Sequence, residues 1–191
     1  YLMDGQTLIK DGPVPNFWRA PIDNDKGNGM ESRCGAWRHA GAKRIIKNCE
    51  IKEVSEKETQ VSFQIDFPEA GSSRMALTYT IYGSGDILVD YTLYPDNSKS
   101  ELPNVGTLIT VPGEFEKIRW FGRGPHENYI GRNRSSFMGV FATTADSMTI
   151  PYMEIGETGQ RTDVKWAALT NEEGRVDLYE ELAQEYPEEY L

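Results

Sequence analysis

Cysteine, histidine and basic residues are scarce in this 191-residue chain, and each shortage narrows what the protein can be. The two cysteines, Cys34 and Cys49, do not make a disulfide framework in a chain of this length, so we expect reduced thiols. The 20 lysines and arginines are outnumbered by 30 acidic residues. The resulting net charge of −10 argues against nucleic acid as a partner, because phosphate binding needs a basic surface.

Long apolar runs are also missing. No stretch approaches the roughly 20 residues that a helix needs to cross a bilayer, so we expect a soluble chain with no membrane partner. The sequence leaves the compartment open between cytoplasm and periplasm. With 38% hydrophobic and 11% aromatic residues, the composition is that of a folded protein rather than a disordered one.

Alternating hydrophobic residues are the main structural signal in the middle of the chain. Val61, Phe63 and Ile65 are separated by polar residues, which is the pattern of a half-buried β-strand. The same period of two predicts strands over residues 61–67, 75–81, 87–93, 105–111, 115–121 and 164–170. Residues 83–86 (GSGD) are typical of a hairpin connection. Strands at this spacing indicate an all-β fold, a large antiparallel sandwich or barrel.

Two segments have a helical pattern instead. Met30, Cys34 and Trp37 fall on one face at helical spacing, so a short helix is expected over residues 30–40. The acidic segment 178–186, which ends at a proline, is the other. Because there is no internal repeat and no low-complexity linker, we expect one domain over residues 1–178, followed by an acidic tail, 179–191.

Three long motifs are the most specific feature of the sequence. They are residues 16–27 (NFWRAPIDNDKG), 120–129 (WFGRGPHENY) and 157–170 (ETGQRTDVKWAALT). In this order and at this spacing they resemble the C-terminal small-chain domain of bacterial β-galactosidases of glycoside hydrolase family 2. The resemblance covers nearly the whole chain, from about Gly5 to about Asn171.

The resemblance implies a more definite fold. Small-chain domains are similar to galactose mutarotases and form a β-supersandwich, in which two large antiparallel sheets pack face to face. In the relatives further strands follow the third motif, whereas no matching segment follows Gly174 here. We therefore expect a supersandwich that is incomplete at its C-terminus.

The resemblance also implies that the chemistry lies elsewhere. In the family the two catalytic glutamates and the Mg²⁺ and Na⁺ sites belong to a preceding (β/α)₈ barrel, and this sequence has no alternating β/α pattern. We expect no catalytic residue, metal site or cofactor site in this chain. The expected role is to pack on the barrel and the other domains of the parent enzyme, to shape the pocket for its β-galactoside substrate, and to support a homo-oligomer.

Side chains of the three motifs are the candidates for contact with substrate or with another domain. They are Trp18, Arg19, Asp23, Asn24, Asp25, Arg123, His126, Glu127, Asn128, Tyr129 and Arg161. Trp18 and Tyr129 stand beside turn-forming residues, where an aromatic ring suits a surface contact. Tryptophans in strands are expected in the core instead, and these are Trp120 and Trp166. Four arginines, at positions 119, 123, 132 and 134, are expected in a solvated or ion-paired loop.

The first motif contains a run that looks like a calcium loop, residues 23–29 (DNDKGNG). An EF-hand needs an oxygen ligand at the fifth position and glutamate at the twelfth, where this chain has Gly27 and Cys34. A simpler cation site stays open, but Asp, Asn and Gly are also common in turns and at helix starts. We favour the structural interpretation, with Asp25 or Asn28 capping a helix that begins near Met30.

His126 and Glu127 invite an acid–base interpretation, because mutarotases use a histidine and a glutamate across one sugar. Adjacent residues in extended backbone point to opposite faces, however, so each would need a different partner. We favour a structural role, in which Arg123, His126, Glu127 and Asn128 brace the Gly-Pro turn. Two alternatives to the galactosidase domain stay open: a free-standing mutarotase-like epimerase built on His126, and a carbohydrate-binding module that would need exposed aromatic residues on one face.

Overall fold

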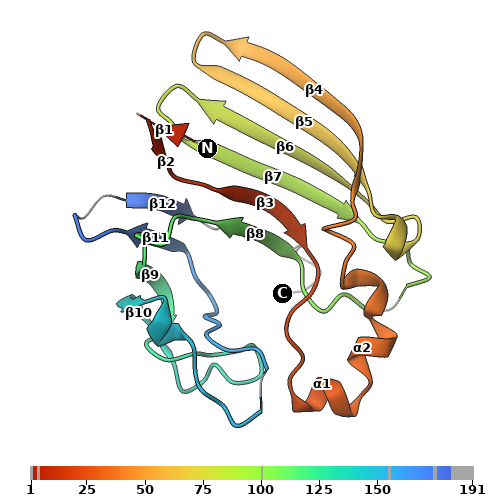
Figure 1. Ribbon diagram of the computed structural model, residues 1–191, viewed down its shortest axis with the longest axis vertical. Coiled ribbons are helices and arrows are strands. Elements are labelled where there is room, and N and C mark those ends of the chain that lie inside the picture. The colour runs from red at the N-terminus through yellow and green to blue at the C-terminus, as the bar shows by residue number, and fades with distance from the viewer. Residues whose placement is uncertain (1, 4, 100, 155, 174–175, 182–191) are drawn as a thin grey trace. The chain divides into compact units, whose positions relative to one another are not determined.

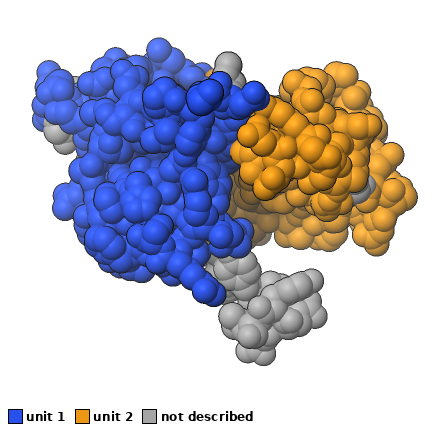
Figure 2. All heavy atoms as spheres, turned by 90° about the horizontal axis from the view of Figure 1, so that it is seen from below, with its two compact units in different colours: residues 1–10, 110–191 blue, residues 11–109 orange. Residues whose placement is uncertain are grey.

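The computed structural model describes residues 2–3, 5–99, 101–154, 156–173 and 176–181. These residues form mostly antiparallel β-sheets with a few short helices (Figure 1), which confirms the all-β class expected from the sequence. The chain divides into two compact units (Figure 2): unit 1 comprises residues 1–10 and 110–191, and unit 2 comprises residues 11–109. Among the described residues, none of the helices has the length and apolar character required to cross a membrane.

Unit 2 is built on a four-stranded antiparallel meander. Its strands, in order across the sheet (Figure 1), are β4 (Ile45–Ser55), β5 (Glu58–Asp66), β6 (Arg74–Tyr82) and β7 (Ile87–Tyr94). The three predicted strands over 61–67, 75–81 and 87–93 are thereby confirmed. The predicted hairpin is also present, since the Tyr82 N–H donates to the Asp86 carbonyl at 2.9 Å and Gly85 adopts a φ of +96°. The alternation pattern misses β4, because all 11 of its residues are exposed.

One face of this meander carries the core of unit 2. Alternate residues of neighbouring strands, including Ile65, Met75 and Leu77, are at most 5% exposed. Phe17 packs edge-on against the rings of Trp37 and Phe67, with ring centroids 5.4 and 4.9 Å apart. Burial of these side chains, at roughly 25 cal/mol per Å² of apolar surface, is the main stabilising term of the unit.

The apolar face predicted for residues 30–40 is confirmed, but the continuous helix is wrong. Met30, Cys34 and Trp37 are all buried, yet Met30 lies in the short helix α2 (Met30–Arg33) and Trp37 in the 3₁₀ turn η1 (Gly35–Trp37), with Cys34 between the two elements. The helix stops at Cys34, directly before Gly35, and glycine in a helix costs about 1 kcal/mol relative to alanine. Contact of these side chains with the core fixes the segment despite its weak helical propensity.

The capping expectation is also wrong. Gly29, with a φ of +72°, precedes α2, and no side chain caps that helix. Asp25 lies inside a separate helix that the sequence does not predict, α1 (Asp23–Gly27), and Asn28 ends that helix. Unit 2 also contains the 3₁₀ turn η2 (Pro68–Ala70) and a two-stranded sheet, formed by β3 (Asp11–Asn16) and β8 (Gly106–Thr110). β8 confirms the strand predicted over residues 105–111.

Unit 1 is built on a second four-stranded antiparallel sheet. Its strands in spatial order are β10 (Phe137–Thr144), β9 (Lys117–Gly124), β11 (Trp166–Thr170) and β12 (Val176–Glu181). β9 and β11 confirm the strands predicted over 115–121 and 164–170, while β10 is not foreseen. The remaining elements of the unit are β1 (Leu2–Met3), β2 (Gln6–Thr7) and the 3₁₀ turn η3 (Asp146–Met148).

Trp120 lies in the middle of the unit 1 sheet and is 2% exposed. The core position expected for it is thereby confirmed. In the register of the sheet Trp120 lies between Phe141 and Ala167, and the rings of Trp120 and Phe141 are 5.5 Å apart. Two residues further along β9, a Cβ atom on Gly122 would lie 2.8 Å from the Cα of Val164. Glycine at this position therefore lets the third motif approach the second.

The helix expected over residues 178–186 is wrong where the structure describes it. Residues 178–181 belong to β12, which pairs with β11 so that Leu178 lies opposite Leu169. Pairing with a neighbouring strand satisfies a whole row of backbone groups, and this outweighs the helical preference of a short acidic segment. The remainder of the expected helix and tail, 182–191, lies outside the described residues.

Candidate functional site

The second and third motifs meet in unit 1 around Asn128, whose side chain is fully buried. The Asn128 amide nitrogen donates to the carbonyl oxygens of Arg123 (3.3 Å) and His126 (3.0 Å). Its side-chain oxygen accepts from the backbone nitrogen of Thr162 (2.9 Å) and from the hydroxyl of the same residue (2.6 Å). Asn128 thus uses every hydrogen-bonding position of its side chain, and it fastens one motif to the other.

Glu127 is the second buried polar residue of this cluster, with 7% of its surface exposed. Its Oε1 accepts hydrogen bonds from Arg132 Nη2 at 2.6 Å and from the Tyr152 hydroxyl. Its Oε2 accepts one from the Gly159 backbone N–H at 3.0 Å. One carboxylate therefore joins the turn after β9 to Tyr152 and to Gly159 of the third motif.

The protonation state of Glu127 follows from these contacts. Burial by itself would raise the pKa of the carboxyl group. The hydrogen bonds from Tyr152, Gly159 and Arg132 outweigh burial and hold the pKa of Glu127 below its ordinary value of 4.5. Glu127 is therefore ionised at neutral pH, whereas a general acid must carry a proton to donate.

Two arginines of the motifs are likewise engaged inside unit 1. Arg123 donates from Nε to the Asp163 carboxylate and from Nη1 to the Ser136 carbonyl at 3.1 Å. Arg161 donates from Nη1 to the carbonyls of Gly159 (3.0 Å) and Gln160 (3.1 Å). The Arg161 guanidinium also lies 5.0 Å from the centre of the Trp120 ring. Burial lowers the pKa of Arg161, and its Nε has no hydrogen-bond partner among the described residues.

Tyr129 links the second motif to the start of the third motif. Its hydroxyl donates to the Glu157 carbonyl at 3.2 Å, and the Arg132 guanidinium lies 5.2 Å from the centre of its ring. Burial raises the pKa of Tyr129, and the nearby carboxylates of Glu127 and Glu157 raise it further. Tyr129 therefore stays a neutral hydrogen-bond donor at physiological pH.

His126 differs from its neighbour Glu127 because it is exposed. Its Nε2 lies 3.4 Å from the hydroxyl oxygens of Ser135 and Ser136. The two side chains of the His-Glu pair thus have separate surroundings, although the backbone at His126 is a bend rather than an extended strand. The carboxylate of Glu127 is held by its own three donors in the interior of the unit.

The first motif belongs to unit 2 and is braced by one ion pair. Arg19 donates from Nη2 to Asp25 Oδ1 at 2.9 Å and from Nη1 to Asp25 Oδ2, and the backbone N–H of Ile22 also donates to Oδ2 at 3.0 Å. The hydrogen bond from Arg19 is the largest cause of a pKa for Asp25 below its ordinary value. Asp25 is 8% exposed and its carboxylate is committed to these three bonds.

The other candidate residues of the first motif make fewer or more exposed polar contacts. Asp23 and Asn24 are exposed, and Asp23 forms an exposed ion pair with the Lys26 ammonium, 3.6 Å away. Trp18 is partly buried against the core of unit 2, with the Arg38 guanidinium 5.6 Å from its ring centre. Among the described residues, no group of three or more His, Cys, Asp or Glu side chains is arranged to hold a metal ion.

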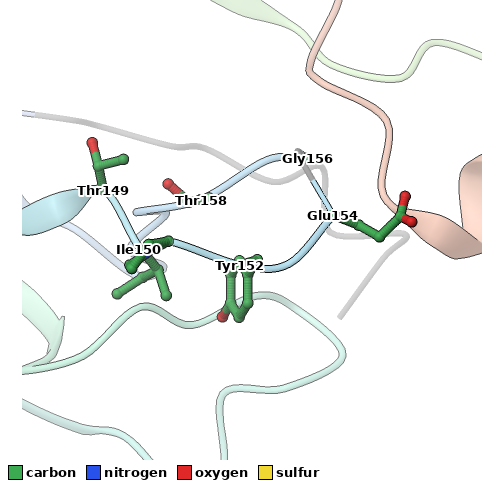
Figure 3. Close-up of a pocket in the computed structure, with 7 residues that line it drawn as sticks. Thr149, Ile150, Tyr152, Glu154, Gly156 and Thr158 are labelled. Carbon is green, nitrogen blue, oxygen red and sulfur yellow. The ribbon is translucent and has the colours of Figure 1, made fainter.

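A hollow of about 250 Å³ lies in unit 1 beside the Glu127 cluster. It is lined by Thr149, Ile150, Pro151, Tyr152, Glu154, Gly156 and Thr158. Figure 3 shows the segment around the hollow, with the Glu154 side chain directed away from the Tyr152 ring. The tyrosine that lines this hollow is the one that donates its hydroxyl to Glu127.

Comparison with known proteins gives the family of the chain. The family model described as the β-galactosidase small chain matches residues 1–191. This chain belongs to the β-galactosidase small-chain family.

Curated relatives support the assignment to the small-chain family. A β-galactosidase of Priestia megaterium is 35% identical over 92% of this chain. β-Galactosidases of Psychromonas ingrahamii and Lactobacillus delbrueckii subsp. bulgaricus are each 31% identical, over 88% and 91% of the chain. The chain spans 17% of the length of each of these relatives, so it corresponds to one region of a much larger enzyme.

Some partners in this small-chain cluster carry no signal in the sequence. Tyr152 lies 25 residues from Glu127, and Thr162 lies 34 residues from Asn128. Tyr152 lies outside the three motifs, and the third motif, which contains Thr162, does not by itself point to a bond with Asn128. The expected ion pairs are present for Arg123 and Arg132, each of which pairs with a carboxylate. The expected loop is wrong for Arg119 and Arg123, because both lie in strand β9. Arg119 and Arg134 are exposed, in keeping with a solvated position.

Proposed function

We propose that this chain is a non-catalytic β-sandwich domain of a β-galactosidase that hydrolyses terminal β-D-galactosides. The proposal rests on the family match and on the short length of the chain relative to its relatives. The chain matches the small-chain family throughout, and it spans 17% of relatives that are named β-galactosidases. A domain of this size in such an enzyme packs on the other domains and contributes a wall to the substrate pocket rather than the reacting groups.

The contacts of the motif residues support a bracing role. The polar side chains that could take part in chemistry, Glu127, Asn128 and Asp25, are buried and bind groups of their own unit. Retaining glycosidases need two carboxyl groups about 5 Å apart, one of which must be protonated. Asp25 and Glu127 both have lowered pKa values, and each is fixed in a separate hydrogen-bond network.

The alternatives receive less support from the geometry. A mutarotase-like epimerase needs a histidine and a carboxylate facing each other across a cleft, and the Glu127 carboxylate is buried and bound to three donors. A free-standing carbohydrate-binding module needs exposed aromatic rings on one face. Two of the candidate rings, Trp18 and Tyr129, instead lie near the Arg38 and Arg132 guanidinium groups and are partly buried.

The partners proposed for the chain are the remaining domains of its own enzyme. In this proposal the β-galactoside is bound by the whole enzyme, a homo-oligomer, and the Mg²⁺ and Na⁺ ions are held by domains outside this chain. The residues described here contribute shape and packing to that assembly, through the motif-rich turns of both units.

Hydrolysis of a chromogenic β-galactoside by the whole enzyme and by this chain alone tests the proposal. We expect turnover by the whole enzyme and none above the blank by the chain. We also expect an enzyme that lacks residues 1–191 to lose activity and to regain part of it when the purified chain is added. Turnover by the chain that persists through further purification would refute the non-catalytic assignment.

The epimerase alternative has its own measurement, the rate at which α-D-galactose anomerises in the presence of the chain. We expect the spontaneous rate. An acceleration that disappears in the His126→Ala variant, but not in the Ser135→Ala variant, would place acid–base chemistry at His126 and favour the epimerase.

A further inference from the structure

The segment that surrounds the hollow of unit 1 carries apolar side chains on its outer surface. Met153 is fully exposed, and Tyr152 is 47% exposed. We call residues 149–154 and 156–158 the docking loop. A single exposed apolar residue needs no explanation, but several on one segment beside a hollow mark a surface that another part of a protein covers.

Hydrogen bonds with residues of the second motif fix the conformation of the docking loop. Glu127 accepts hydrogen bonds from the Tyr152 hydroxyl and, just beyond the loop, from the Gly159 backbone. The Tyr129 hydroxyl donates to the Glu157 carbonyl at 3.2 Å. Gly159 has a φ of +81°, and a Cβ atom there would lie 2.7 Å from the Met148 carbonyl oxygen. A loop fixed in this way loses little conformational freedom when it binds, which favours its use as a contact surface.

The volume of the hollow indicates which kind of chemical group could bind in it. Pockets for small ligands occupy roughly 300–1,000 Å³ and enclose most of the ligand. The hollow here has about 250 Å³ and is walled on its apolar side by Ile150, Pro151 and Tyr152. This space and lining suit one apolar side chain of a neighbouring protein surface better than they suit a sugar.

We propose that the docking loop binds another domain of the same β-galactosidase, with an apolar side chain of that domain in the hollow and with Met153 covered. This inference rests on the proposed function, and it adds to it the surface through which the small chain meets the rest of the enzyme. Since the chain spans 17% of its relatives, most of such an enzyme is available as a partner. The net charge of −10 favours a partner face rich in lysine and arginine.

Methionine oxidation in the whole enzyme tests the docking without a mutation. Methionine sulfoxide forms at a rate that follows exposure of the sulfur, and mass spectrometry reports each site separately. Met30 and Met75, which are 3% and 2% exposed, supply the buried reference within the same chain. Each rate is divided by the rate of the same methionine in the urea-unfolded enzyme. We expect Met153 to be protected at least tenfold, as the buried pair is.

The result that overturns the docking is a Met153 rate within a factor of two of its unfolded value. Protection that appears only when a galactoside is bound would also overturn it, because the loop would then face the substrate and not a domain. Activity toward a chromogenic β-galactoside is measured on the same preparation. If the enzyme is active and Met153 is unprotected, only the docking fails, whereas an enzyme without galactosidase activity refutes the proposed function itself.

A charge at the same position gives a second measurement. Met153→Glu and Met153→Lys leave the interior of the chain unchanged, because the side chain is fully exposed here. In the whole enzyme we expect both variants to lower the midpoint of thermal unfolding, and lysine to lower it more, because the partner face is basic. The control is Lys57→Glu, which changes an exposed charge of unit 2. Midpoints equal to the control in both variants would contradict the docking.

Discussion

Thr162 donates two hydrogen bonds to one atom, the side-chain oxygen of Asn128, from its backbone nitrogen at 2.9 Å and from its hydroxyl at 2.6 Å. The two residues are 34 positions apart and belong to different motifs. Removal of this fully buried amide takes one hydrogen bond from each of four groups, and the Arg123 carbonyl alone keeps a second donor among the described residues, Trp120 Nε1 at 3.2 Å. This pair is therefore the most sensitive point of the unit 1 cluster.

Replacement of Asn128 by alanine should destabilise the chain by about 3 kcal/mol, because buried donors and acceptors of both motifs lose their partners. Asn128→Asp keeps the shape but turns an oxygen toward the carbonyls of Arg123 and His126, so we expect a similar loss. Urea unfolding measures both. The control is Asn24→Ala, an exposed asparagine of the first motif, with an expected change within about 0.5 kcal/mol. Equal stability of the Asn128 and Asn24 variants would contradict the bridging role.

The Glu127→Gln substitution should destabilise the chain in a pH-dependent way. The folded pKa of Glu127 is lowered, so its contribution is complete above the unfolded pKa of about 4.5 and is lost as the pH falls through the folded value. We expect the difference in free energy of unfolding between wild type and Glu127→Gln to be largest near neutral pH and to shrink below about pH 4.5. Urea unfolding across this range measures it, with the exposed Glu114→Gln as control. A difference that grows on acidification would have the wrong sign.

The two ion pairs of the first motif should contribute very differently to stability. Arg19 and Asp25 form a two-pronged, partly buried pair, and Arg19→Lys removes the fork that fits the carboxylate. We expect a loss of about 1–2 kcal/mol for Arg19→Lys. Lys26→Ala breaks the exposed pair with Asp23, whose atoms are 3.6 Å apart, and should change stability by less than about 0.5 kcal/mol. Thermal unfolding of both variants checks the contrast, and equal losses would show that the fork is unimportant.

Substitution of Gly122 by alanine should separate the second and third motifs. The new methyl group would lie 2.8 Å from the Cα of Val164, and backbone on both sides would have to shift. We expect a loss of about 2–3 kcal/mol. Gly113→Ala is the matched control, because no atom lies within 4 Å of the added carbon and its effect should stay within about 0.5 kcal/mol. Denaturant unfolding distinguishes the two, and an unchanged midpoint for Gly122→Ala would contradict the close approach.

Strands with one buried face were predictable because burial alternates along them. Val61, Phe63 and Ile65 reveal β5 for this reason. β4 is missed because all of its residues are exposed, and a strand exposed on both faces places no constraint on the order of polar and apolar residues. β10 is not foreseen either, although alternate residues at its centre are partly buried. The predicted helix over 30–40 identified the correct buried residues but the wrong backbone conformation. Packing on the meander determines which side chains are buried. A short helix followed by a 3₁₀ turn buries the same side chains as a continuous helix would.

The sequence by itself determined the family and the residues worth inspecting, because the three motifs are long, specific and local. The tertiary structure decided what those residues do. Whether Glu127 is a proton donor or a brace depends on Tyr152 and Gly159, which lie 25 and 32 positions away in the chain. Such contacts form only when the folded chain brings distant residues together. The pKa of a side chain and its hydrogen bonds depend on these contacts and cannot be read from a local sequence pattern.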